Sequence, residues 1–406
     1  MTSTVRNPAI TSVIENSLRL VERWVEAHDY RGYEPFDGLS SPLRRLTLGN
    51  LLLDRLLMQL IRQSPVNLRP LFGVRPLEST KGRGYMASGY LMRLMQTGDP
   101  SYERKARQCL DWLMEHRSRR YAQFSWGNYF DFASRAGRYS KDEPIIVWTA
   151  IIGQACLDGF ELLHDQKYLD VATSVCEWIL ALPRQTTSSG SCLSYLACKG
   201  SFVHNASMLG AAMLARTGRL VGNTEYGRVA AEAMEYSCAR QRPDGSWYYG
   251  EEDHYHWIDS FHTGYNLDSL KCYVSNTGDH TYDGHMSRGF RFFVDHFFGT
   301  DGLPKYYHDR AYPIDIQCAA QAVETLSLFA DREDSALPLA CKVTQWTIDN
   351  MQDRRGHFYY RKYPMTTAKT PMLHWGQATM YKGLSTLLFR LDAAREQPPS
   401  AGLGRR

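Results

Sequence analysis

The 406-residue sequence lacks the features that mark secreted, membrane-spanning and disulfide-bonded proteins. Its nine cysteines are odd in number and form no CxxC pair. Because most of them lie inside apolar helical patterns, where a thiol behaves as a small hydrophobe, we expect free thiols and a reduced, cytoplasmic location. The opening residues hold no apolar run of signal-peptide type. No segment approaches the roughly 18–20 apolar residues of a transmembrane helix, so we expect no membrane span.

Charge and catalytic motifs are equally sparse. The net charge of +4 is small for this length, so it gives no argument for binding nucleic acid or a membrane surface. Neither a GxSxG nucleophile motif, a GK[ST] phosphate loop nor an HExxH metal motif occurs. Aromatic residues are abundant instead, with 25 Tyr and 9 Trp. Their flat apolar faces and hydrogen-bonding tips suit clefts that bind sugar rings, although large helical proteins also use Tyr at helix ends.

A unit of two helices recurs from Lys81 onward. Each unit has a helix rich in small residues, a short turn, a more amphipathic helix and an aromatic connector that contains glycine. The first helices begin near Gly84, Val147, His204, Phe261, Asp315 and His374. The second helices begin near Tyr102, Tyr168, Tyr226, Tyr282 and Leu337. Their starts are about 55–66 residues apart, which is typical of a repeated helical hairpin.

Six first helices but only five partners predict a closed ring. The N-terminal helix, about residues 9–28, has no predecessor, so it can pair with the helix from His374. We therefore predict an all-α fold, a single (α/α)6 toroid over residues 1–395 with short aromatic β-hairpin connectors on one rim. An open α-solenoid is the alternative. Residues 43–63, apolar around much of their circumference, predict an additional buried helix, and residues 396–406 a disordered tail.

This pattern resembles the six-hairpin carbohydrate-active superfamily, which includes unsaturated glucuronyl hydrolases, several polysaccharide lyases and the helical domain of glucuronyl C5-epimerases. The segments RGYEPFDG (31–38) and YPIDIQCAAQ (312–321) are similar to bacterial proteins associated with polysaccharide biosynthesis. The resemblance implies a saccharide substrate and allows association with polysaccharide-biosynthesis enzymes. QRPDGSW (241–247) resembles the QW motif of squalene-hopene cyclases, but no DxDD-type motif accompanies it, so a terpene cyclase is disfavoured.

The stretch from Gln241 to Asn266 carries the densest group of reactive side chains. It begins with a turn, continues through a predicted strand over Ser246–Tyr249, and then gathers acidic residues and three histidines within a dozen positions. In a ring of hairpins, every connector that enters an inner helix lies on the same rim. Side chains from distant connectors should therefore meet in one central cleft.

Two kinds of acid–base chemistry fit this cleft. Glycosidic hydrolysis needs two carboxyl groups, whereas uronate elimination or C5-epimerisation needs a base and a group that holds the developing negative charge. The predicted catalytic residues are Asp131, Asp253, Asp259, His262 and Asp315. Asp259 and His262 are three residues apart at a helix start, so they share a face and Asp259 can orient His262. Helix capping alone also explains Asp259 and Asp315.

The remaining polar and aromatic rim residues are predicted to bind the saccharide. They are Arg83, Tyr85, Trp126, Asn128, Tyr129, His204, Asn205, Trp247, Glu252, His254, His256, Tyr265, Asn266, Arg310, Tyr312, Tyr363, His374 and Trp375. His254, His256 and His262 with Asp253 or Asp259 have the ligand types of a divalent-metal site, but their spacing suits a metal only in a strand or extended loop. We therefore predict no metal and no cofactor, and keep a divalent ion as an alternative. A catalytically silent toroid that binds a saccharide or a partner protein is the rival to an enzyme.

Overall fold

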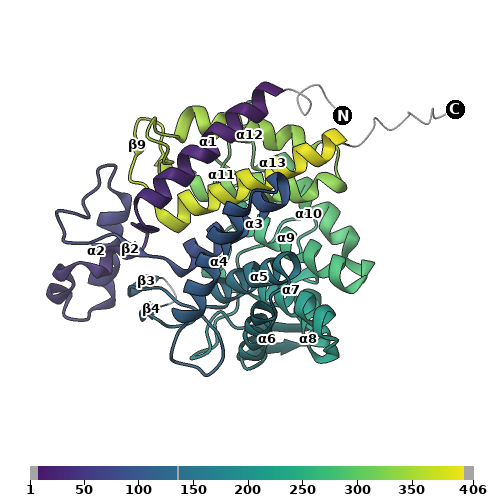
Figure 1. The fold of residues 1–406 in the computed structure, drawn as a ribbon. Coiled ribbons are helices and arrows are strands. Elements are labelled where there is room, and N and C mark those ends of the chain that lie inside the picture. The colour runs from purple at the N-terminus through teal and green to yellow at the C-terminus, as the bar shows by residue number, and fades with distance from the viewer. Residues whose placement is uncertain (1–7, 135–136, 397–406) are drawn as a thin grey trace.

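Six inner helices form a closed ring in the computed structural model, which describes residues 8–134 and 137–396 (Figure 1). In chain order they are α3 (Thr80–Thr97), α5 (Ile146–Leu163), α7 (His204–Val221), α9 (Ser260–Thr277), α11 (Ile316–Leu328) and α13 (Thr379–Glu396). Each packs against the next, and α13 contacts both α11 and α3. This last contact closes the ring, so the predicted toroid is confirmed and the open solenoid is wrong.

An outer helix packs against each inner helix. These are α1 (Pro8–Ala27), α4 (Pro100–Glu115), α6 (Gln166–Leu180), α8 (Thr224–Cys238), α10 (Asp283–His296) and α12 (Ala336–Met351). Helix α1 packs on α13, the last helix of the chain, so the N-terminal helix does supply the sixth partner. The predicted tail falls almost entirely outside the described residues; Glu396 ends α13.

Small residues let the inner helices approach one another closely. A Cβ atom at Gly89 of α3 would come within 2.5 Å of the Tyr381 ring of α13. One inner helix, α5, is long and apolar enough to cross a membrane by length and composition, contrary to the expectation from the sequence. Because 67% of α5 is buried inside the molecule, its apolar character is that of a core helix.

Short antiparallel strands lie in the connectors of one rim. The pairs are β1 (Arg31–Gly32) with β2 (Leu77–Glu78), β3 (Phe132–Ser134) with β4 (Gly137–Tyr139), and β5 (Arg184–Thr187) with β6 (Gly190–Leu193); β8 (Arg361–Lys362) pairs with both β7 (Ile314–Asp315) and β9 (Thr367–Ala368). The predicted hairpin connectors are thus present. The strand predicted over Ser246–Tyr249 is wrong, because this segment is a loop whose Trp247 ring packs on the backbone of Gly289.

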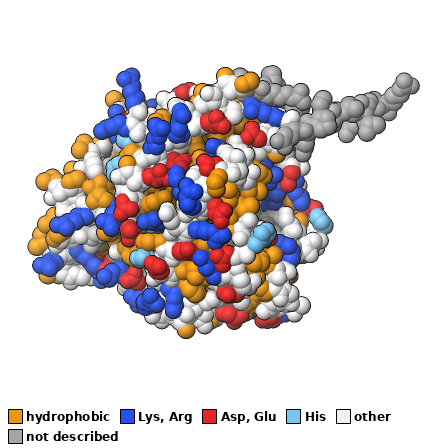
Figure 2. All heavy atoms as spheres, viewed as in Figure 1, with side chains coloured by type: hydrophobic (Ala, Val, Ile, Leu, Met, Phe, Trp, Pro, Cys, Tyr) orange, Lys and Arg blue, Asp and Glu red, His pale blue; other side chains and the backbone are white. Residues whose placement is uncertain are grey.

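The segment after α1 forms an insertion beside the ring. It contains the 3-10 helices η1 (Asp37–Ser40) and η2 (Pro42–Thr47) and helix α2 (Leu51–Gln63), drawn in purple at the left of Figure 1. The prediction of a buried helix over residues 43–63 is wrong. Only Asp54, Met58 and Ile61 of α2 are buried. Figure 2 shows hydrophobic side chains and cations gathered over this side of the molecule.

The nine cysteines are all free. Seven are buried, Cys272 is half-buried and Cys198 is exposed. Burial raises the pKa of the Cys109 and Cys341 thiols to about 11, so these two groups stay protonated and unreactive at neutral pH. Most of the cysteines therefore pack as small apolar residues, as the sequence predicts.

Candidate active site

A small pocket, with free space for about one water-sized group, opens on the rim where the inner helices begin. It is lined by Asn205, Trp247, Tyr248, Tyr249, Trp257, Asp259, His262, Thr263 and Asn266. These residues come from the first turns of α7 and α9 and from the loop that joins α8 to α9. The pocket therefore forms where the connector in the stretch Gln241–Asn266 closes over two helix N-termini, and it contains five of the predicted site residues.

Asp259 and His262 form a hydrogen-bonded pair in this pocket. Asp259 caps α9, because its Oδ1 accepts from the His262 backbone N–H at 3.0 Å. Its Oδ2 lies 2.7 Å from His262 Nδ1 and accepts from the Trp257 indole N–H at 2.9 Å. Asp259 is buried, whereas the His262 side chain is 19% exposed. With Nδ1 held by the carboxylate, Nε2 is the ring nitrogen left for a ligand. Asp259 therefore both caps the helix and orients His262, which are the two roles that the sequence predicted for it.

Two buried amides border the same pocket. Asn205 and Asn266 are 3% and 2% exposed, and among the described residues neither side-chain Oδ1 has a hydrogen-bond partner. A buried polar atom without a partner costs free energy, and such atoms are uncommon in folded proteins. Two of them beside a histidine that faces the pocket mark a place where a polar ligand would complete the hydrogen bonding.

Aromatic rings line the rest of the pocket. The Trp247 indole N–H donates to the Ser237 carbonyl at 2.9 Å, and the Tyr249 and Trp257 rings stack with centroids 4.6 Å apart. Burial raises the pKa of the Tyr249 phenol, so this group is a neutral donor or acceptor at physiological pH. Sequence reasoning missed Tyr248, Tyr249 and Trp257, although all three fall inside the stretch it singled out.

A second polar cluster lies inside the ring near the start of α3. The Tyr265 hydroxyl lies 2.8 Å from the Tyr85 hydroxyl and accepts from Gln317 Nε2 at 3.0 Å. Lys81 Nζ is 3.4 Å from the same hydroxyl. Burial lowers the pKa of Lys81 to about 7. The predicted residues Tyr85 and Tyr265 therefore meet, while Lys81, which begins the same polar rim segment, was not among the predicted site residues.

Asp315 holds a different position from Asp259. It is wholly buried and accepts hydrogen bonds from the Arg361 guanidinium, from the Trp375 indole N–H at 2.7 Å and from the Gln317 backbone N–H at 2.9 Å. It does not line the pocket. A carboxylate that already accepts from three donors is a structural anchor between α11 and its neighbours, and this placement gives no support to a catalytic role.

Asp131 and Asp253 also lie apart from the pocket lining. Asp131 pairs with Arg44 of the insertion and accepts from the Lys141 backbone N–H at 2.6 Å. Asp253 extends fully into solvent on a short surface turn. The expectation that all five predicted catalytic residues share one cleft therefore does not hold, because Asp131 and Asp315 are engaged in ion pairs and Asp253 points outward.

Two predicted binding residues stabilise the core instead. Trp126 is fully buried, and its indole N–H donates to the Leu113 carbonyl at 2.9 Å. The Arg83 guanidinium lies 3.9 Å from the centroid of the Tyr30 ring. These contacts fix the connectors of the rim and leave neither side chain open to a ligand.

Two predicted histidines are likewise buried beside carboxylates. His204 Nε2 lies 2.7 Å from Glu251 Oε1, and His374 Nδ1 lies 2.7 Å from Glu34 Oε2. Burial lowers the pKa of His374 despite the nearby Glu34. Glu34 was not predicted; it belongs to the RGYEPFDG segment and also accepts from the His374 backbone N–H at 2.9 Å.

The other predicted binding residues are spread over the rim. They are Asn128, which is buried, Tyr129, Tyr312 and Tyr363, which are half-buried, and Glu252, His254, His256 and Arg310, which are exposed. The His256 ring stacks on Tyr248 at 4.3 Å. In the described part of the chain, no group of three or more His, Cys, Asp or Glu side chains is arranged to hold a metal ion, so the divalent-ion alternative gains no support.

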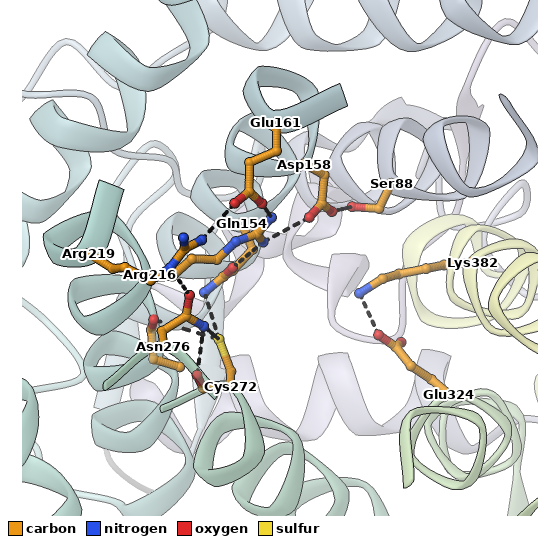
Figure 3. A network of polar contacts seen from close by, with 11 residues as sticks. Ser88, Gln154, Asp158, Glu161, Arg216, Arg219, Cys272, Asn276, Glu324 and Lys382 are labelled. Atoms are coloured by element: carbon orange, nitrogen blue, oxygen red, sulfur yellow. Dashed lines mark hydrogen bonds and ion pairs between the residues drawn. The ribbon is translucent and has the colours of Figure 1, made fainter. Parts of the chain in front are cut away.

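Further along the inner helices, away from the pocket, lies a contrasting network (Figure 3). Arg216 of α7 donates to Gln154 and Asp158 of α5, both at 2.8 Å. Across the ring, Lys382 Nζ lies 2.5 Å from Glu324 Oε1. These charges are paired with one another, so this network holds the helices together, whereas the pocket on the rim leaves polar atoms without partners.

Comparison with known proteins confirms the architecture. No protein-family model and no curated protein matches the sequence. The chain is similar in structure to cellobiose 2-epimerase from Bacillus thermoamylovorans B4167, with 11% identity, coverage of 78% of this chain and 88% of that chain, and a TM-score of 0.61. It is similar to unsaturated glucuronyl hydrolase from Bacillus sp. GL1, with 13% identity, 92% and 95% coverage, and a TM-score of 0.60. An α-mannanase from Bacteroides thetaiotaomicron gives 10% identity, 77% and 87% coverage, and a TM-score of 0.60.

These neighbours are (α/α)6 toroid enzymes. At such low sequence identity the likeness establishes the fold, an (α/α)6 toroid. It does not establish which reaction the chain performs.

Proposed function

We propose that the chain is an enzyme that acts on a saccharide, with His262 as the general base. The observation that carries this proposal is the Asp259–His262 pair at 2.7 Å in a pocket bordered by unpartnered buried amides. A carboxylate that holds one ring nitrogen of a histidine fixes its tautomer and stabilises the imidazolium that forms when the other nitrogen takes a proton. The carbohydrate enzymes that share the fold support a saccharide as the substrate.

The pocket favours proton abstraction from carbon over glycosidic hydrolysis. Hydrolysis requires two carboxyl groups on either side of the scissile bond. Among the residues that line the pocket, Asp259 is the one carboxylate, and three nitrogen contacts already engage it. Abstraction of the proton next to a uronate carboxylate requires instead one base and donors for the developing negative charge. We therefore favour uronate elimination or C5-epimerisation.

Six of the nine lining residues have a role in this reaction. His262 Nε2 takes the C5 proton, and Asp259 stabilises the resulting imidazolium. In elimination the C4–O bond breaks as the C4–C5 double bond forms, and the imidazolium gives its proton to the leaving oxygen; in epimerisation C5 takes a proton from water on the opposite face. The unpartnered Oδ1 atoms of Asn205 and Asn266 accept hydrogen bonds from sugar hydroxyl groups, and the side-chain NH₂ groups of the same residues donate to the substrate carboxylate as charge moves onto it. The stacked rings of Tyr249 and Trp257 offer a flat apolar surface to a sugar ring. We further propose that this enzyme needs no cofactor and works in the cytoplasm beside polysaccharide-biosynthesis enzymes.

Solvent exchange tests the shared first step of both reactions. The protein is incubated in D₂O with a panel of glucuronate-containing oligosaccharides, and deuterium at C5 is followed by NMR together with ultraviolet absorbance of an unsaturated product. We expect wild-type protein to exchange or eliminate this hydrogen. His262→Gln should lower the rate at least about 100-fold, the lower end of a general base's contribution, and Asp259→Asn should lower it by a similar factor.

A matched control is provided by a second Asp–His pair. His280 and Asp283 are also three residues apart, with His280 Nδ1 2.9 Å from Asp283 Oδ2, but they are exposed on the opposite rim. His280→Gln should leave the rate unchanged. Saccharide binding by the wild type without any exchange would instead favour the non-catalytic toroid, and full activity of His262→Gln would refute the proposed base.

A further inference from the structure

The insertion beside the ring presents an unusually apolar surface. Of the thirteen large hydrophobic side chains that are exposed in residues 8–134 and 137–396, ten lie between positions 43 and 71. They are Leu43, Leu46, Leu48, Leu51, Leu52, Leu53, Leu56, Leu60, Val66 and Leu71. We call these ten side chains the leucine patch. Ten exposed apolar side chains in one short segment of a folded protein indicate a surface that contacts something other than water.

The insertion holds the leucine patch outward on a fixed base. Asn50 caps α2 by accepting from the Leu52 backbone N–H at 2.9 Å. Met58 and Ile61 on the opposite face of α2 are buried, and Met58 packs so closely on Gly38 that a Cβ atom there would come within 2.9 Å of the Met58 Cα. Because one face of the helix is anchored, the exposed leucines are not free to turn inward.

The segment that carries the leucine patch also carries cations and contributes no exposed carboxylate. Residues 42–76 contain six arginines, no lysine, no glutamate and one aspartate, Asp54. The Asp54 side chain is wholly buried and paired with Arg138. Arg45 and Arg75 are exposed, Arg55 is half-buried, and none of these three arginines has an ion-pair partner among the described residues. The surface is therefore both apolar and positively charged.

We propose that the leucine patch docks on an anionic lipid bilayer. Leucines beside arginines allow apolar side chains to enter the boundary between head groups and acyl chains while the cations meet lipid phosphates. A second copy of this chain fits less well, because a symmetric contact would bring the arginines of both copies together. A protein partner is also less suited, since Leu and Val are under-represented among the residues that anchor protein interfaces and Trp and Tyr are enriched there, whereas the exposed side chains of the patch are leucines and one valine.

This docking is peripheral and does not depend on the proposed reaction. The apolar side chains belong to a short helix and its flanking loops, which lie on the surface of the folded ring, so the protein would rest on the membrane without crossing it. The small net charge of the whole chain gives no sign of this site, because residues 42–76, with six arginines and one aspartate, have a net charge of +5, while the rest of the chain has a net charge of −1.

Co-sedimentation with vesicles tests the proposal. The full chain is mixed with vesicles of phosphatidylglycerol and phosphatidylcholine, or of phosphatidylcholine alone, at low and at high salt. We expect binding to the anionic vesicles that weakens with salt. Leu52→Ser combined with Leu56→Ser and Leu60→Ser should weaken binding by at least about tenfold, because each exposed leucine contributes to apolar burial in the bilayer.

Variants that change the charge of the insertion test the contribution of the arginines. Changing Arg45, Arg55 and Arg75 together to glutamate should also weaken binding by at least about tenfold, from roughly 1 kcal/mol per cation near an anionic surface. A control with the same change of charge replaces exposed arginines on the ring: Arg104→Glu, Arg291→Glu and Arg354→Glu. This control should bind markedly better than the triple-glutamate variant of the insertion. Circular dichroism should show the same helix content in every variant, because all the replaced side chains are exposed except Arg55, which is half-buried.

Three outcomes would overturn the proposal. They are a failure of the wild-type protein to sediment with anionic vesicles at any lipid concentration, equal binding to neutral and anionic vesicles, and an equal loss of binding in the ring and insertion charge variants. Concentration-dependent dimerisation that the serine variant abolishes, without vesicle binding, would identify a second copy of the chain as the occupant.

Discussion

Two lysines inside the ring should respond in opposite ways to replacement by methionine. Lys81 is 3% exposed, and no carboxylate of the described residues lies within ion-pair distance of it. Lys382 Nζ instead lies 2.5 Å from Glu324 Oε1. A buried charge without a partner opposes folding, whereas removal of one member of a buried pair leaves the other unpaired. Lys81→Met should therefore stabilise the protein, and Lys382→Met should destabilise it.

The pKa of Lys81 sets the size of the stabilisation expected for Lys81→Met. Burial lowers this pKa from 10.5 to about 7. Each tenfold weakening of proton binding is equivalent to roughly 1.4 kcal/mol, so the buried lysine opposes folding by up to about 5 kcal/mol. Methionine would lose the contact with the Trp148 ring, 4.8 Å from Lys81 Nζ, and the hydrogen bond to Tyr265, together about 1–2 kcal/mol. We expect a net gain of about 3 kcal/mol in the free energy of unfolding at pH 7.

The pH dependence of the stability tests whether the lowered pKa of Lys81 causes this difference. Between about pH 7 and pH 10.5 the unfolded chain holds a proton on Lys81 that the folded chain lacks, so the stability of the wild type rises with pH over this range. The advantage of Lys81→Met should thus be largest at and below pH 7 and should shrink towards pH 10. Urea denaturation followed by circular dichroism at pH 7 and pH 9.5 measures both quantities.

Lys382, which is paired with Glu324, should respond in the opposite way to replacement by methionine. Lys382→Met leaves Glu324 unpaired beside Asp268, whose pKa is already raised by burial and by Glu324. We expect a loss of about 3–5 kcal/mol. A destabilised Lys81→Met variant at pH 7, or a difference from wild type that does not change with pH, would show that Lys81 is held charged in the fold and would refute the reasoning.

Three further predictions concern stability. Asp315→Ala leaves the Arg361 guanidinium buried without its partner, so the free energy of unfolding should fall by about 3–5 kcal/mol; an unchanged urea midpoint would contradict the structural role. Gly245 has φ of +93°, and a Cβ there would collide with a backbone carbonyl oxygen of α10, so Gly245→Ala should lose at least about 1 kcal/mol in the same assay. Burial lowers the pKa of His357 and His374. As the pH falls, both histidines therefore become protonated in the unfolded chain before they do in the folded chain, so the melting temperature should fall as pH drops below about 6.5. His357→Gln should make the melting temperature less dependent on pH in this range.

The ring could be predicted because its pattern is periodic. Small residues recur on every inner helix, and the count of six first helices against five partners required the N-terminal helix to complete the set. The sequence could not show what covers an apolar face. Leucine around the circumference of α2 gives the same pattern whether the helix is buried or stands at the surface, so residues 43–63 match the pattern of an interior helix although they carry most of the leucine patch.

The candidate site was only partly predictable for a related reason. Asp259 and Asp315 both precede inner helices and both cap them, so their local sequences cannot separate the two. Their tertiary contacts distinguish them. Arg361, 46 residues further along the chain, pairs with Asp315, whereas His262 lies one turn from Asp259. The spacing along the chain can predict the contact between Asp259 and His262, but the contact between Asp315 and Arg361 depends on the packing of β8 against β7.

The contrast between the two ends of the ring explains why the pocket is a better candidate than the network of Figure 3. Arg216 sits among Asp158, Glu161 and Gln154, so those charges already satisfy one another. On the other rim, Asn205 and Asn266 have buried oxygens that no described residue pairs. Folding gains nothing from leaving these atoms unpaired. Because buried atoms without a partner also occur elsewhere in the described residues, it is their position beside His262 that leads us to propose the helix N-termini as the saccharide site.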